Sequence, residues 1–132
     1  MTPRAEHTLE FLLDFDGREH VFEHGHYVKF EIHRVDPSPG IPHGIRYSFT
    51  MHDPAGKRIL GYDNAHAIER GKPWDHRHGV RRLYAKPYGR VKPQLIEFKD
   101  AETLLEQFYG DVERILKILG LSNRVEDVRR QK

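Results

Sequence analysis

Apolar and polar residues alternate along much of the first two-thirds of the chain, which is the pattern of strands with one buried face. Val28, Phe30 and Ile32 alternate with charged and imidazole side chains, and residues 45–52 repeat this pattern before a turn sequence at residues 53–56. The alternation predicts an antiparallel sheet of about five or six strands. Further strands are expected at residues 9–15, 21–22, 58–62, 80–85 and 94–98.

After residue 100 the spacing of apolar residues changes to that of an amphipathic helix, which is expected to end at residue 119. Asp100 is expected to cap its N-terminus, because a carboxylate there accepts hydrogen bonds from the free amides of the first turn. Gly120 is expected to end it. Gly110, within the helix, costs about 1 kcal/mol relative to alanine, and we expect it to allow close packing on the sheet. The apolar face comprises Leu104, Leu105, Phe108, Val112, Ile115, Leu116 and Leu119.

These patterns predict one α+β domain, in which the C-terminal helix packs against the antiparallel sheet. A length of 132 residues suffices for one hydrophobic core. We expect residues 1–7 to be a loose N-terminus and residues 8–98 to be mostly β-structure. Residues 101–119 are then the helix, and residues 121–132 a polar tail or a short second helix.

Composition narrows the class of protein. The chain has no cysteine, which excludes disulfides, thiolate metal sites and cysteine nucleophiles. No apolar run approaches the ~20 residues that a membrane-spanning helix needs, and the first residues lack the apolar stretch of a secretion signal. We therefore expect a soluble, cytoplasmic protein without a membrane partner. The sequence motifs of phosphate-binding loops, dinucleotide sites, serine hydrolases and HExxH metalloproteases are absent.

The net charge of +2 hides a strongly basic strip at residues 70–92. The strip has eight basic residues and one acidic residue, Asp75, and so carries a net charge of +7. Trp74, Tyr84 and Tyr88 are interleaved with the basic residues. Because basic side chains neutralise phosphates and aromatic rings stack on unpaired bases, the strip suits a nucleic acid. The alternative is a solvated edge strand that is protected by charge.

Groups that transfer protons gather in residues 61–66 and residues 75–78, on either side of a connection that contains glycine and proline. The two stretches hold three histidines, two aspartates, an asparagine and an arginine. In an extended chain residues i and i+2 point to the same side, so we expect His76 and His78 to face one pocket, with Arg77 turned away. A connection that folds back would bring His66 near this pair.

Three kinds of function remain open for this cluster. In metal-free RNA cleavage, a neutral histidine takes the proton of a ribose 2′-OH and a protonated histidine gives one to the leaving 5′-oxygen. In a metal site, the His-x-His pair would join His66 or a carboxylate and leave one position open. In the third, the histidines bond to the backbone and only hold a loop or bind a partner. The basic strip favours a phosphate substrate, because its charge would repel a divalent cation.

For RNA cleavage each set of residues has a role, and neither a metal nor a cofactor is required. Catalysis is assigned to His66, His76, His78 and Arg77. Orientation of the histidines is assigned to Asp63, Asn64 and Asp75. RNA binding is assigned to Arg46, Arg70, Lys72, Trp74, Arg81, Arg82, Tyr84 and Lys86. The histidines expected at the surface are His7, His20 and His33.

The same stretches carry a family resemblance. In order, residues 43–47, 61–66 and 75–78 and the helix pattern at residues 104–112 resemble the TumE family of small prokaryotic toxin–antitoxin proteins, over about residues 8–119. The resemblance implies the toxin component of a two-gene module, with a small helix-turn-helix antitoxin as partner. It supplies no catalytic residues, and RNA cleavage is an analogy with other growth-inhibiting proteins. An apolar helix face left over from the core would serve the antitoxin or a second copy of the chain.

Overall fold

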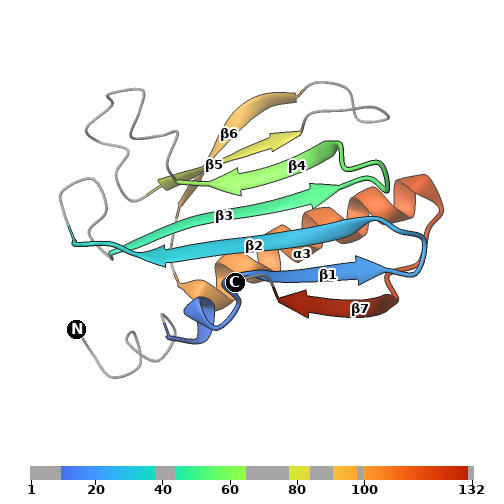
Figure 1. The fold of residues 1–132 in the computed structure, drawn as a ribbon. Coiled ribbons are helices and arrows are strands. Elements are labelled where there is room, and N and C mark those ends of the chain that lie inside the picture. Colours follow the sequence, from blue (N-terminus) through green and yellow to red (C-terminus); the bar gives the residue numbers. More distant parts are fainter. Residues whose placement is uncertain (1–9, 38–43, 65–77, 84–90, 98–99, 131–132) are drawn as a thin grey trace.

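A computed structural model gives the fold and describes residues 10–37, 44–64, 78–83, 91–97 and 100–130. Within these residues seven strands form one antiparallel sheet, and the long C-terminal helix lies across one face of it (Figure 1). This arrangement confirms the α+β fold predicted from the pattern. No helix in the described ranges is long and apolar enough to cross a membrane.

The strands are ordered in space nearly as in the sequence. The sheet order is β6-β5-β4-β3-β2-β1-β7, so the first six strands form a meander, and the chain returns after the helix to pair β7 with β1. The elements are β1 (Arg18–Phe22), β2 (Tyr27–Arg34), β3 (Ile45–His52), β4 (Arg58–Asp63), β5 (His78–Leu83), β6 (Val91–Glu97), α3 (Ala101–Leu119) and β7 (Val125–Arg130).

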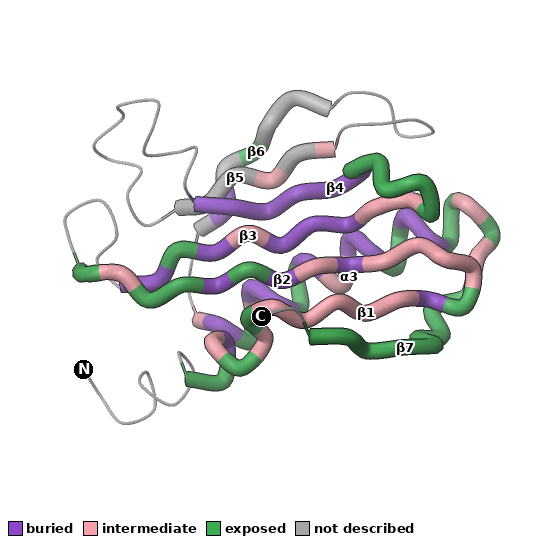
Figure 2. Tube along the Cα trace, viewed as in Figure 1, coloured by how far each residue is buried: buried purple, intermediate pink, exposed green. Residues whose placement is uncertain are grey.

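The hydrophobic core lies between the sheet and α3 (Figure 2). Phe30 of β2 is paired with Phe49 of β3, and both rings pack against Phe108 of α3, with ring centroids 5.3 to 5.8 Å apart. All three side chains are almost fully buried, and most of the ring pairs meet edge to face, as aromatic quadrupoles favour. Because strand residues alternate between faces, burying this set leaves the polar set on the opposite face.

The predicted helix boundaries are confirmed. The Asp100 carboxylate accepts a hydrogen bond of 2.7 Å from the amide of Thr103, which is the expected N-cap. Gly120 has a φ of 71°, in the left-handed region that favours glycine at a helix C-terminus. Gly110 is not at a close contact. A Cβ added there would approach only the Arg114 guanidinium, at 3.8 Å, so the predicted close packing on the sheet is wrong.

Both ends of the described chain differ from the prediction. Residues 10–13, expected as part of a strand, are helical, because a helical turn places Leu12 in the core at 0% exposure. The last residues were expected as a polar tail or short helix, but residues 125–130 form β7. Every side chain of β7 is exposed, so its strand structure comes from backbone pairing with β1 and leaves no hydrophobic alternation to recognise.

His20 was expected at the surface, but it is half-buried. Its ring lies beside Phe30 and Tyr109, and Nδ1 is 2.9 Å from the Tyr109 hydroxyl. The register explains this position, because His20 pairs with Val28, whose side chain belongs to the core face of the sheet. His33, on β2, is exposed as expected.

Candidate functional site

The two halves of the proton-transfer cluster, residues 61–66 and 75–78, include the end of one strand and the start of the next strand in the sheet. β4 ends at Asp63 and β5 begins at His78, and the two strands pair with Asp63 opposite Val80. Asp63 and Val80, close to residues 65–77 in the sequence on either side, are therefore neighbours in the sheet (Figure 1). That His66, His76 and His78 act together stays a prediction.

Most of the predicted site residues lie outside the described residues, so their roles stay predictions. Four of them belong to the proton-transfer cluster: His66, Asp75, His76 and Arg77. Five belong to the basic strip: Arg70, Lys72, Trp74, Tyr84 and Lys86. For His78 and Arg82 the structure describes the backbone, in β5, and not the side chain.

Asn64 is buried and bonded to the backbone of β3. Its side-chain oxygen accepts from the Tyr47 amide at 3.0 Å, and its side-chain nitrogen donates to the Ile45 carbonyl at 2.7 Å. The side chain thus extends the pairing of β3 with β4 by one step. Since both polar atoms are engaged, Asn64 fixes where the segment at residues 65–77 begins.

Arg81 belongs to the side of the sheet that α3 covers. It pairs with Tyr62 in the register, and its guanidinium makes two hydrogen bonds to Asp111 of α3 and one to Gln94 of β6. Burial by itself would raise the pKa of Asp111, but hydrogen bonds from Arg81, Tyr62 and Arg114 lower it overall. The RNA-binding role predicted for Arg81 therefore competes with a buried ion pair.

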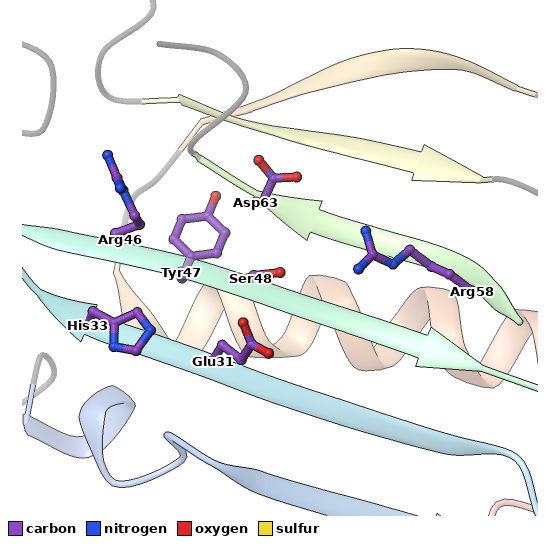
Figure 3. Close-up of a pocket in the computed structure, with 7 residues that line it drawn as sticks. All are labelled: Glu31, His33, Arg46, Tyr47, Ser48, Arg58 and Asp63. Carbon is purple, nitrogen blue, oxygen red and sulfur yellow. The ribbon is translucent and has the colours of Figure 1, made fainter. Parts of the chain in front are cut away.

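The face of the sheet opposite α3 carries a cavity of about 270 Å³ (Figure 3). Two residues predicted as part of the site, Arg46 and Asp63, line it. The register explains the grouping, because His33 is opposite Arg46, while Glu31, Ser48 and Asp63 follow one another across three strands. The full lining is Glu31, His33, Arg46, Tyr47, Ser48, Arg58 and Asp63.

Besides Tyr47, four of these lining residues were missed from the sequence: Glu31, His33, Ser48 and Arg58. Each had the appearance of an ordinary residue on the polar side of a strand. The signal that could have found them is the pairing of Glu31 and His33 at positions i and i+2 on β2, which sets both on one face. Strand register, which sequence alone did not fix, brings Arg46 opposite His33 and Ser48 opposite Glu31.

Tyr47 also lines the cavity, and its hydroxyl is buried without a hydrogen-bond partner within the described part of the chain. Burial raises the pKa of Tyr47, and the charge of Asp63 adds to the effect, so the hydroxyl keeps its proton at neutral pH. Its ring lies beside that of Phe49, with ring centroids 5.2 Å apart, so the side chain belongs to the core side of β3, while Arg46 and Asp63 in Figure 3 belong to the opposite face.

The described residues contain no group of three histidine, aspartate or glutamate side chains arranged to hold a metal ion. The His-x-His pair considered as a metal ligand set lies partly outside them, so that alternative stays a prediction.

Comparison with known proteins gives one result. A protein-family model described as Toxin TumE matches residues 10–116, a range that runs from before β1 into α3 and includes both stretches of the proton-transfer cluster. Neither the curated proteins nor the solved structures include a significant match to the chain.

Proposed function

The chain belongs to the TumE toxin family, and from this premise we propose that the toxin cleaves RNA without a metal, by histidine acid–base catalysis. The observation that carries the proposal is the pairing of β4 with β5, two strands that in the sequence are separated by the residues that include His66 and His76. The basic strip at residues 70–92 overlaps these residues and supplies the charge that a phosphate substrate requires.

The proposed reaction is a transesterification. A neutral histidine, from among His66, His76 and His78, takes the proton of the ribose 2′-OH, and the 2′-oxygen forms a bond to phosphorus. The bond from phosphorus to the 5′-oxygen breaks, and a second, protonated histidine gives its proton to that oxygen. Arg77 stabilises the charge on the phosphate, and the products are a 2′,3′-cyclic phosphate and a free 5′-OH.

The acidic and amide residues at the ends of the segment would orient the histidines. A carboxylate of Asp63 or Asp75 accepts from the second ring nitrogen of a histidine and fixes its tautomer. Asn64 acts indirectly, because its hydrogen bonds to β3 fix the point from which the segment leaves the sheet. Arg46 and the strip from Arg70 to Lys86 hold the RNA.

The family implies an antitoxin partner. In our proposal this partner is a small helix-turn-helix protein and the pair acts in the cytoplasm, either with one copy of the toxin or with a homo-oligomer. A neighbouring reading frame with a helix-turn-helix pattern would support this assignment.

A second function, binding of RNA or of a partner without catalysis, is favoured by one observation. Asn64 and Arg81, both predicted at the site, are bonded within the fold. This alternative predicts an RNA affinity that falls steeply with salt and that survives removal of single histidines. It also predicts that no cleavage product forms. A nuclease that requires a bound metal would instead lose activity in a chelator.

The two functions are separated by incubating the purified toxin with single-stranded RNA in excess EDTA. We expect cleavage, and we expect His76→Ala and His78→Ala each to lower its rate by about 10²-fold or more, as for loss of a general acid or base. His7→Ala, outside the matched family range, is the control and should keep the rate. Wild-type rates in both His76→Ala and His78→Ala would refute the assignment, and binding without product would leave the second function.

A further inference from the structure

We propose that the cavity opposite α3 is a subsite for one ribonucleotide unit, in which Arg46 and His33 bind the phosphate and Glu31 accepts from the ribose 2′-OH. The inference rests on RNA being the ligand, as proposed above, but it concerns residues that the motifs do not include. A cavity of about 270 Å³ lies just below the range of roughly 300–1,000 Å³ that is usual for small-molecule sites, and it suits a single nucleotide.

The position of the cavity connects it to the predicted site. Asp63, the last residue of β4, lines the cavity and directly precedes Asn64, where the described chain leaves the sheet. Arg46, assigned to RNA binding from the sequence, lies on the neighbouring strand β3. A nucleotide in the cavity would therefore sit beside the start of the segment to which catalysis is assigned.

The side chains needed for binding are available. Glu31, His33 and Arg46 are all exposed, and none of the three makes a hydrogen bond or ion pair with another described residue. His33 and Arg46 are directly opposite one another on adjacent strands, which places their Cβ atoms roughly 5 Å apart. A guanidinium and an imidazole N–H at this separation can both donate to one phosphate group.

The carboxylates decide the class of ligand. A site for a phosphate ion alone would gain nothing from Glu31, because a carboxylate repels an anion. A carboxylate that accepts from a ribose hydroxyl is the usual partner of that group, and the 2′-OH is what distinguishes RNA from DNA. Asp63 is only 8% exposed and interacts with other groups of the protein, so Glu31 is the carboxylate open to a ligand.

The test uses ligands that contain no bond for the toxin to cleave. Ribonucleoside 5′-monophosphates, their 2′-deoxy counterparts and inorganic phosphate are titrated separately into ¹⁵N-labelled protein, and the backbone amide signals of β2 and β3 are followed by NMR. We expect the ribonucleotides to shift the signals around Glu31, His33 and Arg46. They should bind about fivefold more tightly than the 2′-deoxy forms, the effect of one net hydrogen bond.

Variants separate the two contacts. Arg46→Gln should weaken ribonucleotide binding by about tenfold or more, because it removes a charge-assisted hydrogen bond. Glu31→Ala, which removes the acceptor, should keep the binding but lose the preference for ribose. Lys29→Gln, which removes a charge from the same strand outside the cavity lining, is the matched control and should have little effect.

Equal affinity for ribonucleotides, 2′-deoxynucleotides and inorganic phosphate would overturn the inference, as would equal effects of Lys29→Gln and Arg46→Gln. Absence of shifts in β2 and β3 would also overturn it. These results are independent of the proposed cleavage. A toxin that cuts RNA but shows no nucleotide binding in the cavity refutes only the inference, whereas one that binds ribonucleotides there and cuts nothing refutes only the cleavage.

Discussion

At the scale of single residues, the buried carboxylate of Asp111 accepts hydrogen bonds from both the sheet and its own helix. The residue is 2% exposed, and its carboxylate accepts hydrogen bonds from Tyr62 of β4, Arg81 of β5 and Arg114 of its own helix. Burial raises the pKa of Tyr62, and its hydrogen bond to Asp111 adds to the effect, so the phenol stays a donor. These hydrogen bonds connect α3 with β4 and β5, the two strands next to the predicted site.

The two arginines that share Asp111 differ in exposure, and this predicts unequal contributions to stability. The Arg81 side chain is 22% exposed and that of Arg114 is 68% exposed. We expect Arg81→Gln to lower the free energy of unfolding by about 2–3 kcal/mol, since it leaves a buried carboxylate short of a partner. Arg114→Gln should cost less than about 1 kcal/mol. Urea denaturation at pH 7 measures both, and equal losses would contradict this role of Arg81.

The burial of His20 lets us predict how the free energy of unfolding depends on pH. Burial lowers the pKa of His20, with a further effect of Arg18, and its Nε2 is buried without a partner among the described residues. The folded state therefore favours the neutral ring, whereas the unfolded chain takes up a proton near pH 6.5. Burial likewise lowers the pKa of His26 and of His52.

Because the folded-state pKa is the lower one, this stabilisation is fully present above about pH 6.5 and is lost as the pH falls toward the folded-state value. We expect the melting temperature to be flat from pH 8 to pH 7 and to fall below about pH 6.5. His20→Phe, which keeps a ring beside Phe30, should make this fall shallower. An unchanged slope in His20→Phe would show that another group is responsible.

At the scale of elements, α3 was predictable to the residue because several independent signals agree. Its apolar spacing runs along the whole helix. The Asp100 cap and the Gly120 stop each act within one turn of the helix end that they define. β7 was not predictable, since its side chains are all exposed and only pairing with β1 makes it a strand. The helical turn at residues 10–13 was missed because its apolar residues also alternate as a strand would.

Alanine substitutions of Gly110, within α3, and of Gly120, which caps its C-terminus, are expected to have opposite effects on stability. Gly110 is within the helix and has room for a methyl group, so Gly110→Ala should raise the free energy of unfolding by about 0.5–1 kcal/mol. Gly120 has a positive φ of 71°, so Gly120→Ala should lower it by about 1 kcal/mol although nothing obstructs the added carbon. Thermal or urea unfolding of both variants checks the pair, and a destabilised Gly110→Ala would mean that the helix packs more tightly than described.

At the scale of the whole molecule, one face of the sheet packs against α3 to form the core, and the other carries the cavity. The alternation that predicted the strands also assigned the faces, so Phe30 and Phe49 were correctly expected in the core. The cavity on the second face was not predictable, because Glu31, Arg46 and Asp63 come from three strands that only the register brings together. The histidine cluster was recognisable because it is local in sequence.

The chemistry of the RNA ends that the toxin leaves behind tests the central claim most directly. Purified toxin is incubated in EDTA with a 5′-labelled single-stranded RNA and, separately, with a DNA strand of the same sequence. We expect RNA fragments that end in a 2′,3′-cyclic phosphate and an intact DNA strand, because the 2′-OH is the nucleophile. Fragments with 3′-hydroxyl ends, cleavage of the DNA, or no product until a metal is added would contradict metal-free histidine catalysis.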